Sequence, residues 1–226
     1  MTAPLITLIT DFGYRDYFVG SVKGVILGIS PDARIVDISH NVAPQDREEA
    51  AFILKAAYRY FPPRTIHIVV VDPGVGSARK PIVVTNDRGK FVAPNNGVLT
   101  HILDEEPESR AYHVTASHYF LPSPGATFHG RDLFAPIAAW LSTGVPVENM
   151  GPVEHDLERF PVRQPSIGAD GKLIGEVIYV DRFGKPRKHP AVDVARDARI
   201  GFARLVRELG LDAGDPDAAR PPRGRH

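Results

Sequence analysis

Two acidic residues near the start of the chain stand in a turn where a carboxylate could bind a ligand. Asp11 directly follows the apolar run Leu5–Thr10 and precedes Phe12-Gly13, and Asp16 lies five residues further on. A carboxylate between a strand and a helix can accept two hydrogen bonds from the hydroxyls of a ribose. The same two side chains could instead cap the helix that follows, so the pattern leaves both interpretations open.

A third carboxylate, Asp72, directly follows the run Thr65–Val71 and precedes Pro73-Gly74-Val75-Gly76. Proline and the two glycines predict a tight turn, after which Arg79 is close enough along the chain to fold back towards Asp72. The segment has neither the Gly-Lys-Ser/Thr of a phosphate loop nor the glycine spacing of a dinucleotide fold. Asp72 and Arg79 are therefore either a pair that acts on a ligand or a pair that only holds the loop.

Three further segments carry polar or aromatic side chains at the ends of elements. His129, in Phe128-His129-Gly130-Arg131-Asp132, precedes an apolar helix, where it could titrate near neutrality or serve only as a cap. Asn95 and Asn96 lie in a turn and could serve only backbone groups. Asp181 and Phe183 follow a strand in what could be an ordinary loop. The nine histidines are scattered, and we expect no metal site.

The elements that would position these residues alternate between strand and helix in the first half of the chain. Short apolar runs predict strands at 5–10, 34–38, 65–71, 81–85, 110–114 and 174–180, and helical spacing or caps predict helices at 19–29, 46–60, 132–141 and about 199–209. This alternation predicts a three-layer α/β domain with a largely parallel sheet. In such domains ligands bind at the carboxyl ends of the strands, where Asp11 and Asp72 fall.

The composition is that of a globular protein, with 43% hydrophobic and 24% charged residues in 226. Lys+Arg and Asp+Glu both total 27, so no overall basic field favours nucleic acid or anionic lipid as a partner. The chain lacks cysteine, which excludes disulfides and thiolate chemistry. No basic n-region and no apolar run of about 18–20 residues is present, so we expect no membrane association and a cytoplasmic location.

Taken in order, the motifs resemble those of one family, the S-adenosylmethionine (SAM) hydrolases or SAM hydroxide adenosyltransferases, relatives of the SAM-dependent fluorinase and chlorinase. The resemblance is carried by Thr10-Asp-Phe-Gly13, Val36-Asp-Ile-Ser-His40, Asp72-Pro-Gly-Val-Gly76 with Arg79, Ala93-Pro-Asn-Asn-Gly97, Phe128-His-Gly-Arg-Asp132 and Asp181-Arg-Phe-Gly184. It spans about residues 4–184.

The resemblance implies cleavage of SAM by water at the 5′ carbon, giving adenosine and methionine, with SAM as substrate and no cofactor. Asp72, Arg79 and His129 would hold the attacking water, and either Asp72 or His129 would be the base. Asp11 would bind the ribose, and Asp16 and Asp181 would lie near the methionine ammonium group. The resemblance also implies substrate contacts for a last set, Asn95, Asn96, Phe128 and Phe183, and a homotrimer with SAM between subunits.

The resemblance stops after Gly184, where Lys185 stands in place of the family's asparagine. We therefore expect a catalytic α/β domain at 1–160, a linker at 161–172, a truncated remnant of a small β-rich domain at 173–210 and a tail without fixed structure at 211–226. A truncated or frame-shifted reading of a longer gene would explain this ending. It leaves two alternatives to a hydrolase: a catalytically impaired protein that binds adenosine or SAM, and a SAM-dependent halogenase, which the water-holding trio disfavours.

Overall fold

The computed structural model describes residues 3–162, 165–167, 173–175 and 177–179. Contacts along the chain divide it into two units, Met1–Phe160 and Pro161–His226. Asp181 and Phe183, both expected to contact substrate, lie outside the described residues, as do most of the region expected to be a remnant domain, the helix expected near 199–209 and the tail.

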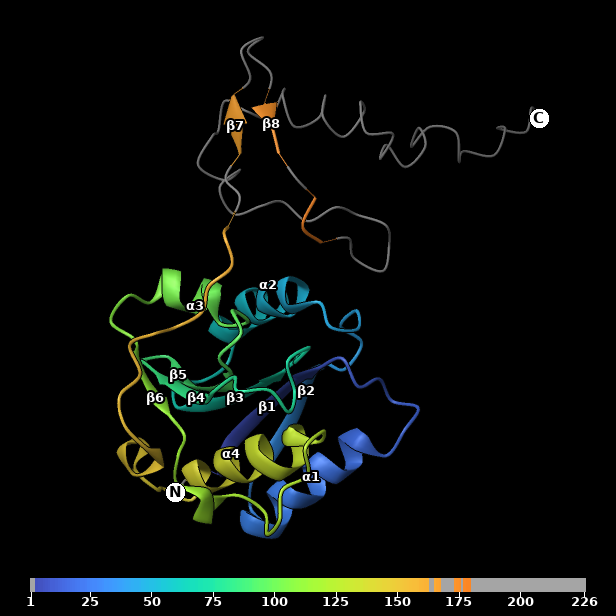
Figure 1. Ribbon diagram of the computed structural model, residues 1–226, viewed down its shortest axis with the longest axis vertical. Helices are drawn as coiled ribbons and strands as arrows, with labels where there is room; N and C mark the ends of the chain where they lie inside the picture. Colours follow the sequence, from blue (N-terminus) through green and yellow to red (C-terminus); the bar gives the residue numbers. More distant parts are fainter. Residues whose placement is uncertain (1–2, 163–164, 168–172, 176, 180–226) are drawn as a thin grey trace, which may run out of the picture. The chain divides into compact units, whose positions relative to one another are not determined.

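The first unit is built on a six-stranded sheet in the order β2-β1-β3-β5-β4-β6 (Figure 1). Its strands are β1 (Leu5–Thr10), β2 (Arg34–Ser39), β3 (Thr65–Val70), β4 (Pro81–Thr85), β5 (Gly89–Pro94) and β6 (Arg110–His113). The first three strands and β5 are parallel, whereas β4 runs antiparallel to both β5 and β6. The sheet is thus mostly parallel, with an antiparallel edge.

Helices cover both faces of this sheet, with α1 and α4 on one side and α2 and α3 on the other (Figure 1). Their bounds are α1 (Phe18–Ile29), α2 (Arg47–Ala57), α3 (Thr100–Glu105) and α4 (Ala135–Ser142), with short turns of helix at Tyr58–Tyr60, Ser117–Tyr119, Gly130–Phe134 and Val147–Met150. Each face has its own apolar core. Ile6, Leu8 and Ile68 pack towards α1 and α4, and Ile9 and Val69 towards α2 and α3.

The predicted α/β architecture and its three layers are confirmed, and so are most of its elements. Val19, Val22 and Ile26 form the buried stripe of α1 at helical spacing, and Asp46 caps α2 by accepting the Glu49 N–H at 2.9 Å. Strand β5 and helix α3 were not predicted, because every residue from 91 to 100 is buried and no apolar–polar alternation marks them.

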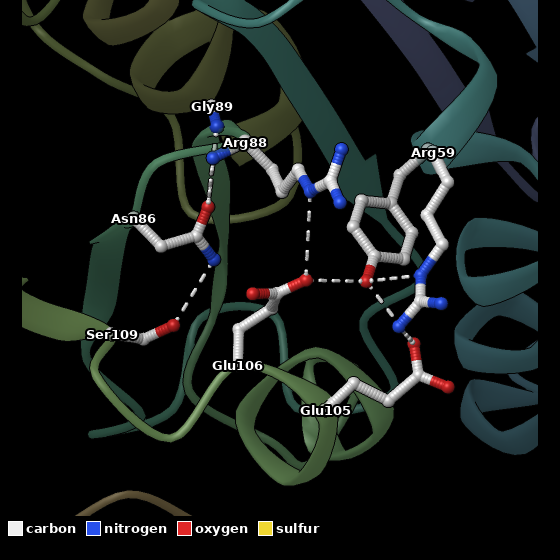
Figure 2. Close-up of polar contacts among 8 residues, drawn as sticks. Arg59, Asn86, Arg88, Gly89, Glu105, Glu106 and Ser109 are labelled. Carbon is white, nitrogen blue, oxygen red and sulfur yellow. Dashed lines mark hydrogen bonds and ion pairs between the residues drawn. The ribbon is translucent and has the colours of Figure 1, made fainter.

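A cluster of charged and polar side chains lies near the amino end of β3 and is shown in Figure 2. The Tyr58 hydroxyl accepts a hydrogen bond from Nε of Arg59 at 2.9 Å and lies 3.1 and 2.9 Å from carboxylate oxygens of Glu105 and Glu106. Burial first, and then the two acids, raise the pKa of Tyr58 to about 12. The cluster joins the segment after α2 to the end of α3.

The second unit contributes one described pair of strands, β7 (Ser166–Ile167) and β8 (Leu173–Ile174), which are antiparallel. The strand predicted at 174–180 is therefore wrong for the residues that can be compared, since only Ile174 is in a strand and residues 175 and 177–179 are not. Within the described part of the chain no helix is both long and apolar enough to cross a membrane.

Candidate active site

The first strands of the sheet create the place where the candidate residues meet. Strand β1 lies between β2 and β3, and all three are parallel. The chain leaves β1 through α1 on one face and reaches β3 through α2 on the other (Figure 1). The carboxyl ends of β1 and β3 therefore flank a topological switch point, the position at which open α/β sheets bind their ligands.

Asp11 and Asp72 stand on the two sides of this switch point. Thr10 pairs with Val70 at the ends of β1 and β3, so Asp11 and Asp72 leave the same edge of the sheet one and two residues later. This confirms the expected placement of the two carboxylates at strand ends.

The loop after β3 folds Arg79 back onto Asp72. Two turns follow one another, with Val75 N–H donating to the Asp72 carbonyl at 3.2 Å and Ser77 N–H to the Gly74 carbonyl at 3.0 Å. Nε of Arg79 then donates to Oδ2 of Asp72 at 2.7 Å, and its NH2 group donates to the same oxygen. Both side chains are nearly buried, at 5% exposure for Asp72 and 7% for Arg79.

His129 reaches the same pair from the other half of the unit. It precedes the π-helical turn Gly130–Phe134 that leads into α4, and its Nδ1 lies 2.7 Å from the NH2 group of Arg79. The guanidinium also lies over the ring of Phe134, 5.2 Å from its centroid. The structure thus brings Asp72, Arg79 and His129 into one cluster, with Arg79 at its centre.

The protonation state of His129 follows from these contacts. Because a guanidinium can only donate, Nδ1 of His129 must be the acceptor and the ring proton must sit on Nε2. Burial, followed by the charge of Arg79, lowers the pKa of His129, against the opposing effects of Asp72 and Asp132. The ring is therefore neutral near pH 7.

One buried oxygen of the cluster has no hydrogen-bond partner among the described residues. Oδ1 of Asp72 is buried and accepts no hydrogen bond from any residue that the structure describes. Leaving a buried carboxylate oxygen unpaired costs about 1–3 kcal/mol or more, and such atoms in functional sites often await a ligand or a water. The cluster can therefore still accept one hydrogen-bond donor, at an atom shielded from bulk solvent.

Two further contacts hold the loops of this cluster together. Gly76 has a φ of +79°, and a Cβ at this position would lie 2.8 Å from the Ala126 carbonyl oxygen, so the turn after Asp72 packs directly on the loop before His129. Buried Asp132 holds that loop from within, as its Oδ2 accepts the Gly125 N–H at 2.8 Å. Gly76 and Asp132 were part of the sequence motifs, but their spacing alone did not reveal these roles.

The turn that carries Asp11 is joined to the His129 loop by aromatic rings. Phe128 lies edge-on to Phe12 and Phe18, with centroid separations of 5.8 and 5.1 Å. These contacts place the residue after Asp11 against the residue before His129. Phe128 is therefore part of the wall between the two loops.

Asp11 and Asp16 do not cap α1, which excludes the alternative that the sequence left open. Helix α1 begins after Tyr17, and in this described region no side chain caps it. Oδ2 of Asp11 instead accepts the Gln45 N–H at 2.9 Å, while its Oδ1 has no partner among the described residues. Asp16 is exposed on the loop before α1.

Asn95 and Asn96 are placed differently from the other candidates, since both are buried and their amides bind backbone groups. Asn95 donates to the Asp156 carbonyl and accepts the Glu158 N–H, at 2.8 and 2.9 Å. Asn96 donates to the Val71 carbonyl at 3.0 Å and accepts the Val98 N–H at 3.1 Å. Asn96 thereby fixes the end of β3 next to Asp72, and a direct contact of either amide with substrate stays a prediction.

Fold and cluster together define an α/β protein with a polar site at a switch point, and comparison with known proteins identifies its family. The model of the SAM hydroxide adenosyltransferase N-terminal domain matches residues 6–151, more than half of the chain. The chain therefore belongs to the SAM hydroxide adenosyltransferase family, which is related to SAM hydrolases and fluorinases.

The relatives of this chain include both SAM hydrolases and fluorinases. The (R)-S-adenosyl-L-methionine hydrolase of Salinispora tropica is 39% identical over 184 residues, which are 80% of this chain and 70% of that protein. The fluorinase of Nocardia brasiliensis is 30% identical over 207 residues, 80% of this chain and 69% of the fluorinase. Among solved structures, an uncharacterized conserved protein from Thermotoga maritima is 42% identical with a TM-score of 0.75, over 79% of this chain and 68% of that one.

Proposed function

We propose that this protein hydrolyses S-adenosyl-L-methionine at the 5′ carbon, with water as the nucleophile, and releases adenosine and L-methionine. The observation that carries the proposal is the buried cluster of Asp72, Arg79 and His129, in which Oδ1 of Asp72 is buried and has no partner among the described residues. The hydrolases among the relatives, at 35–39% identity, match better than the fluorinases, at 29–30%.

The chemistry of SAM suits a site of this kind. The sulfonium leaves as a neutral thioether, so the leaving group needs neither an acid nor a metal. The nucleophile is the difficulty, because water must be aligned with the C5′–S bond, partly removed from solvent and relieved of a proton as it attacks. The products are adenosine, methionine and one proton.

The geometry favours Asp72 over His129 as the base. The acceptor nitrogen of His129 is already used by Arg79, and protonation of the ring would place a second cation against the guanidinium. Asp72 keeps Oδ1 for the water while Arg79 binds Oδ2. In this proposal Asp72 accepts the water proton, Arg79 fixes the carboxylate, and His129 fixes Arg79.

The remaining candidate residues supply the substrate contacts. Oδ1 of Asp11 accepts a ribose hydroxyl across the switch point from Asp72, and Asp16 lies near the methionine ammonium group together with Asp181. Binding of SAM between subunits of a homotrimer belongs to the same proposal. Light scattering of the purified protein measures that oligomeric state directly.

The test is incubation of the purified protein with SAM in water enriched in oxygen-18, followed by chromatography and mass spectrometry. We expect adenosine and methionine in equal amounts, with the heavy oxygen in the 5′ hydroxyl of adenosine. Asp72→Asn preserves the shape but not the charge, and should reduce the rate at least about 100-fold, as expected for loss of a general base. Asp87→Asn, the same change on an exposed turn, should leave the rate unchanged.

Other outcomes identify the alternatives. Formation of 5′-halo-5′-deoxyadenosine that depends on added halide would make the protein a halogenase. Binding of SAM or adenosine by the folded protein without any turnover would make it a catalytically impaired binding protein. Equal rates for Asp72→Asn and wild type would remove Asp72 from the mechanism.

A further inference from the structure

Behind Asp11 lies a second polar network that shares no residue with the Asp72 cluster. Oγ1 of Thr10 is hydrogen-bonded to Nδ1 of His40 at 2.7 Å. Nε2 of His40 lies 3.1 Å from Oδ1 of Asp37, at ion-pair distance, but neither of these two buried atoms forms a well-directed hydrogen bond with any described residue. Thr10 and His40 are each only 1% exposed. Burying polar side chains costs free energy unless each one is paired. Two such side chains next to a candidate ligand-binding carboxylate therefore suggest a role in the site.

The direction of the Thr10–His40 hydrogen bond can be assigned. Nε2 of His40 faces a carboxylate oxygen of Asp37, which has no proton to give, so the proton of a neutral ring belongs on Nε2 and Nδ1 is left as an acceptor. The Thr10 hydroxyl therefore donates to Nδ1. Its oxygen in turn accepts the Phe12 N–H at 3.2 Å. The hydroxyl has a partner for its proton and another for its lone pair only in this arrangement.

The charges around His40 are consistent with a neutral ring. Burial lowers the pKa of His40, although Asp37 opposes this, and the charge of Lys23 lowers it further. Nζ of Lys23 donates to Oδ2 of Asp37 at 2.6 Å and so neutralises the carboxylate from its other side. The ring of Tyr14 packs edge-on against that of His40, with centroids 5.0 Å apart.

The network ends on the two residues that follow Asp11. Thr10 binds the N–H of Phe12 through its side chain, and the His40 carbonyl accepts the N–H of Gly13 at 2.7 Å. These two bonds fix the backbone directly after Asp11, while the Gln45 N–H holds its Oδ2. The direction of the Asp11 carboxylate is thus set by β2 and the loop that follows it, as well as by its own strand.

We propose that Thr10, His40 and Asp37 are positioning residues for the reaction: a buried relay that orients the Asp11–Gly13 turn so that Asp11 can bind the ribose hydroxyls of the substrate. The inference rests on the proposed function for the identity of the ligand. It extends that function to residues that do not touch the substrate, and it assigns a role to the Asp37–His40 segment of the sequence.

The relay is tested by removing one hydroxyl without changing the shape of the side chain. Thr10→Val breaks the relay, and Thr10→Ser keeps it. Thr7→Val is the matched control, since Thr7 is on the same strand, is equally buried and also binds a histidine, with Oγ1 2.8 Å from Nδ1 of His67. A purely structural role for both hydroxyls predicts the same outcome for both valine variants.

We expect Thr10→Val to raise KM for SAM about 10-fold with a smaller change in kcat, and Thr10→Ser and Thr7→Val to stay within about twofold of wild type. Calorimetry with adenosine and 2′,3′-dideoxyadenosine supplies the specific readout. Thr10→Val should weaken adenosine binding about 10-fold and leave the dideoxy analogue unaffected. Equal effects of Thr10→Val and Thr7→Val, or equal weakening of both nucleosides, would overturn the proposal.

Failure of the proposed function is distinguishable from failure of the relay. A folded wild-type protein that neither cleaves SAM nor prefers adenosine to its dideoxy analogue would refute the function and with it the ribose-binding role. Hydrogen exchange of the Phe12 and Gly13 amides, followed by NMR, then tests the relay by itself. Faster exchange in Thr10→Val than in Thr7→Val supports a relay that orders this turn, and equal exchange overturns it.

Discussion

His67 should make the free energy of unfolding fall steeply in mild acid. The residue lies on β3, the strand that delivers Asp72, and it is 1% exposed. Its ring stacks on Phe91 with a centroid separation of 5.0 Å, and its Nδ1 pairs with the Thr7 hydroxyl. Burial lowers its pKa to about 4, against about 6.5 in an unfolded chain.

The sign and size of the effect follow from this difference. Below about pH 6.5 the unfolded chain binds a proton at His67 that the folded protein does not, so the stability from the neutral ring is complete above that pH and is lost as the pH falls towards 4. A difference of about 2.5 pKa units, at 1.36 kcal/mol per unit, corresponds to a loss of about 3 kcal/mol by pH 4. That is a large part of the roughly 5–15 kcal/mol available to a typical domain.

Urea unfolding at about pH 8 and pH 4 measures this loss, and a double variant isolates it. Thr7→Val with His67→Phe replaces both polar partners by apolar groups of similar shape, which is close to neutral when both are exchanged together. The two proteins share all their other ionisable groups. Wild type should therefore lose about 3 kcal/mol more than the double variant between the two pH values. Equal losses would show that His67 is not buried as a neutral ring.

Three other changes probe the site and its supports. Gly76→Ala should cost about 1–3 kcal/mol of stability and reduce SAM cleavage, because the methyl group meets the Ala126 carbonyl at a positive φ; unchanged urea midpoint and rate would contradict that packing. Tyr58→Phe should lower the free energy of unfolding by about 1–2 kcal/mol, because it removes the hydroxyl between Arg59 and the two acids. It should leave the rate of SAM cleavage unaltered, and a changed kcat would contradict the separation of this cluster from the active site. His129→Gln keeps an acceptor for Arg79 and should lose about 10-fold in single-turnover rate, less than Asp72→Asn; the reverse order would make His129 the base.

Much of the fold could be predicted because local pattern and burial agree in it. Thr65–Val70 is buried along its whole length because both faces of the sheet are covered, and Asp46 lies where a capping residue must stand before α2. By contrast, β5 begins at Gly89 and ends in Ala93-Pro94, a composition that resembles a turn more than a strand. Its pairing with β3 and β4, which no local signal encodes, makes it a strand.

The candidate site shows the same division between local and long-range causes. The pairing of Asp72 with Arg79 needs only a turn of known chemistry, so the sequence pointed to it directly. The role of Asn96 depends on a carbonyl 25 positions away and that of Thr10 on a histidine 30 positions away. Such contacts are decided by strand order, and a spacing pattern within one segment carries no information about them.

Each of the two polar networks orients one carboxylate, Asp11 after β1 and Asp72 after the neighbouring strand β3. After β3, Oδ2 of Asp72 is bound by Arg79, which His129 contacts in turn, and Oδ1 is left without a partner among the described residues. After β1, the Gln45 N–H binds one oxygen of Asp11 and leaves the other without a partner among the described residues, while the proposed relay holds the turn. In both cases a carboxylate is fixed through one oxygen so that the second can meet a ligand, which orients the side chain before the ligand arrives. A ligand that lies across the switch point then needs one hydrogen-bond donor for each of these two oxygens, and in the proposed reaction a ribose hydroxyl of SAM and the attacking water supply them.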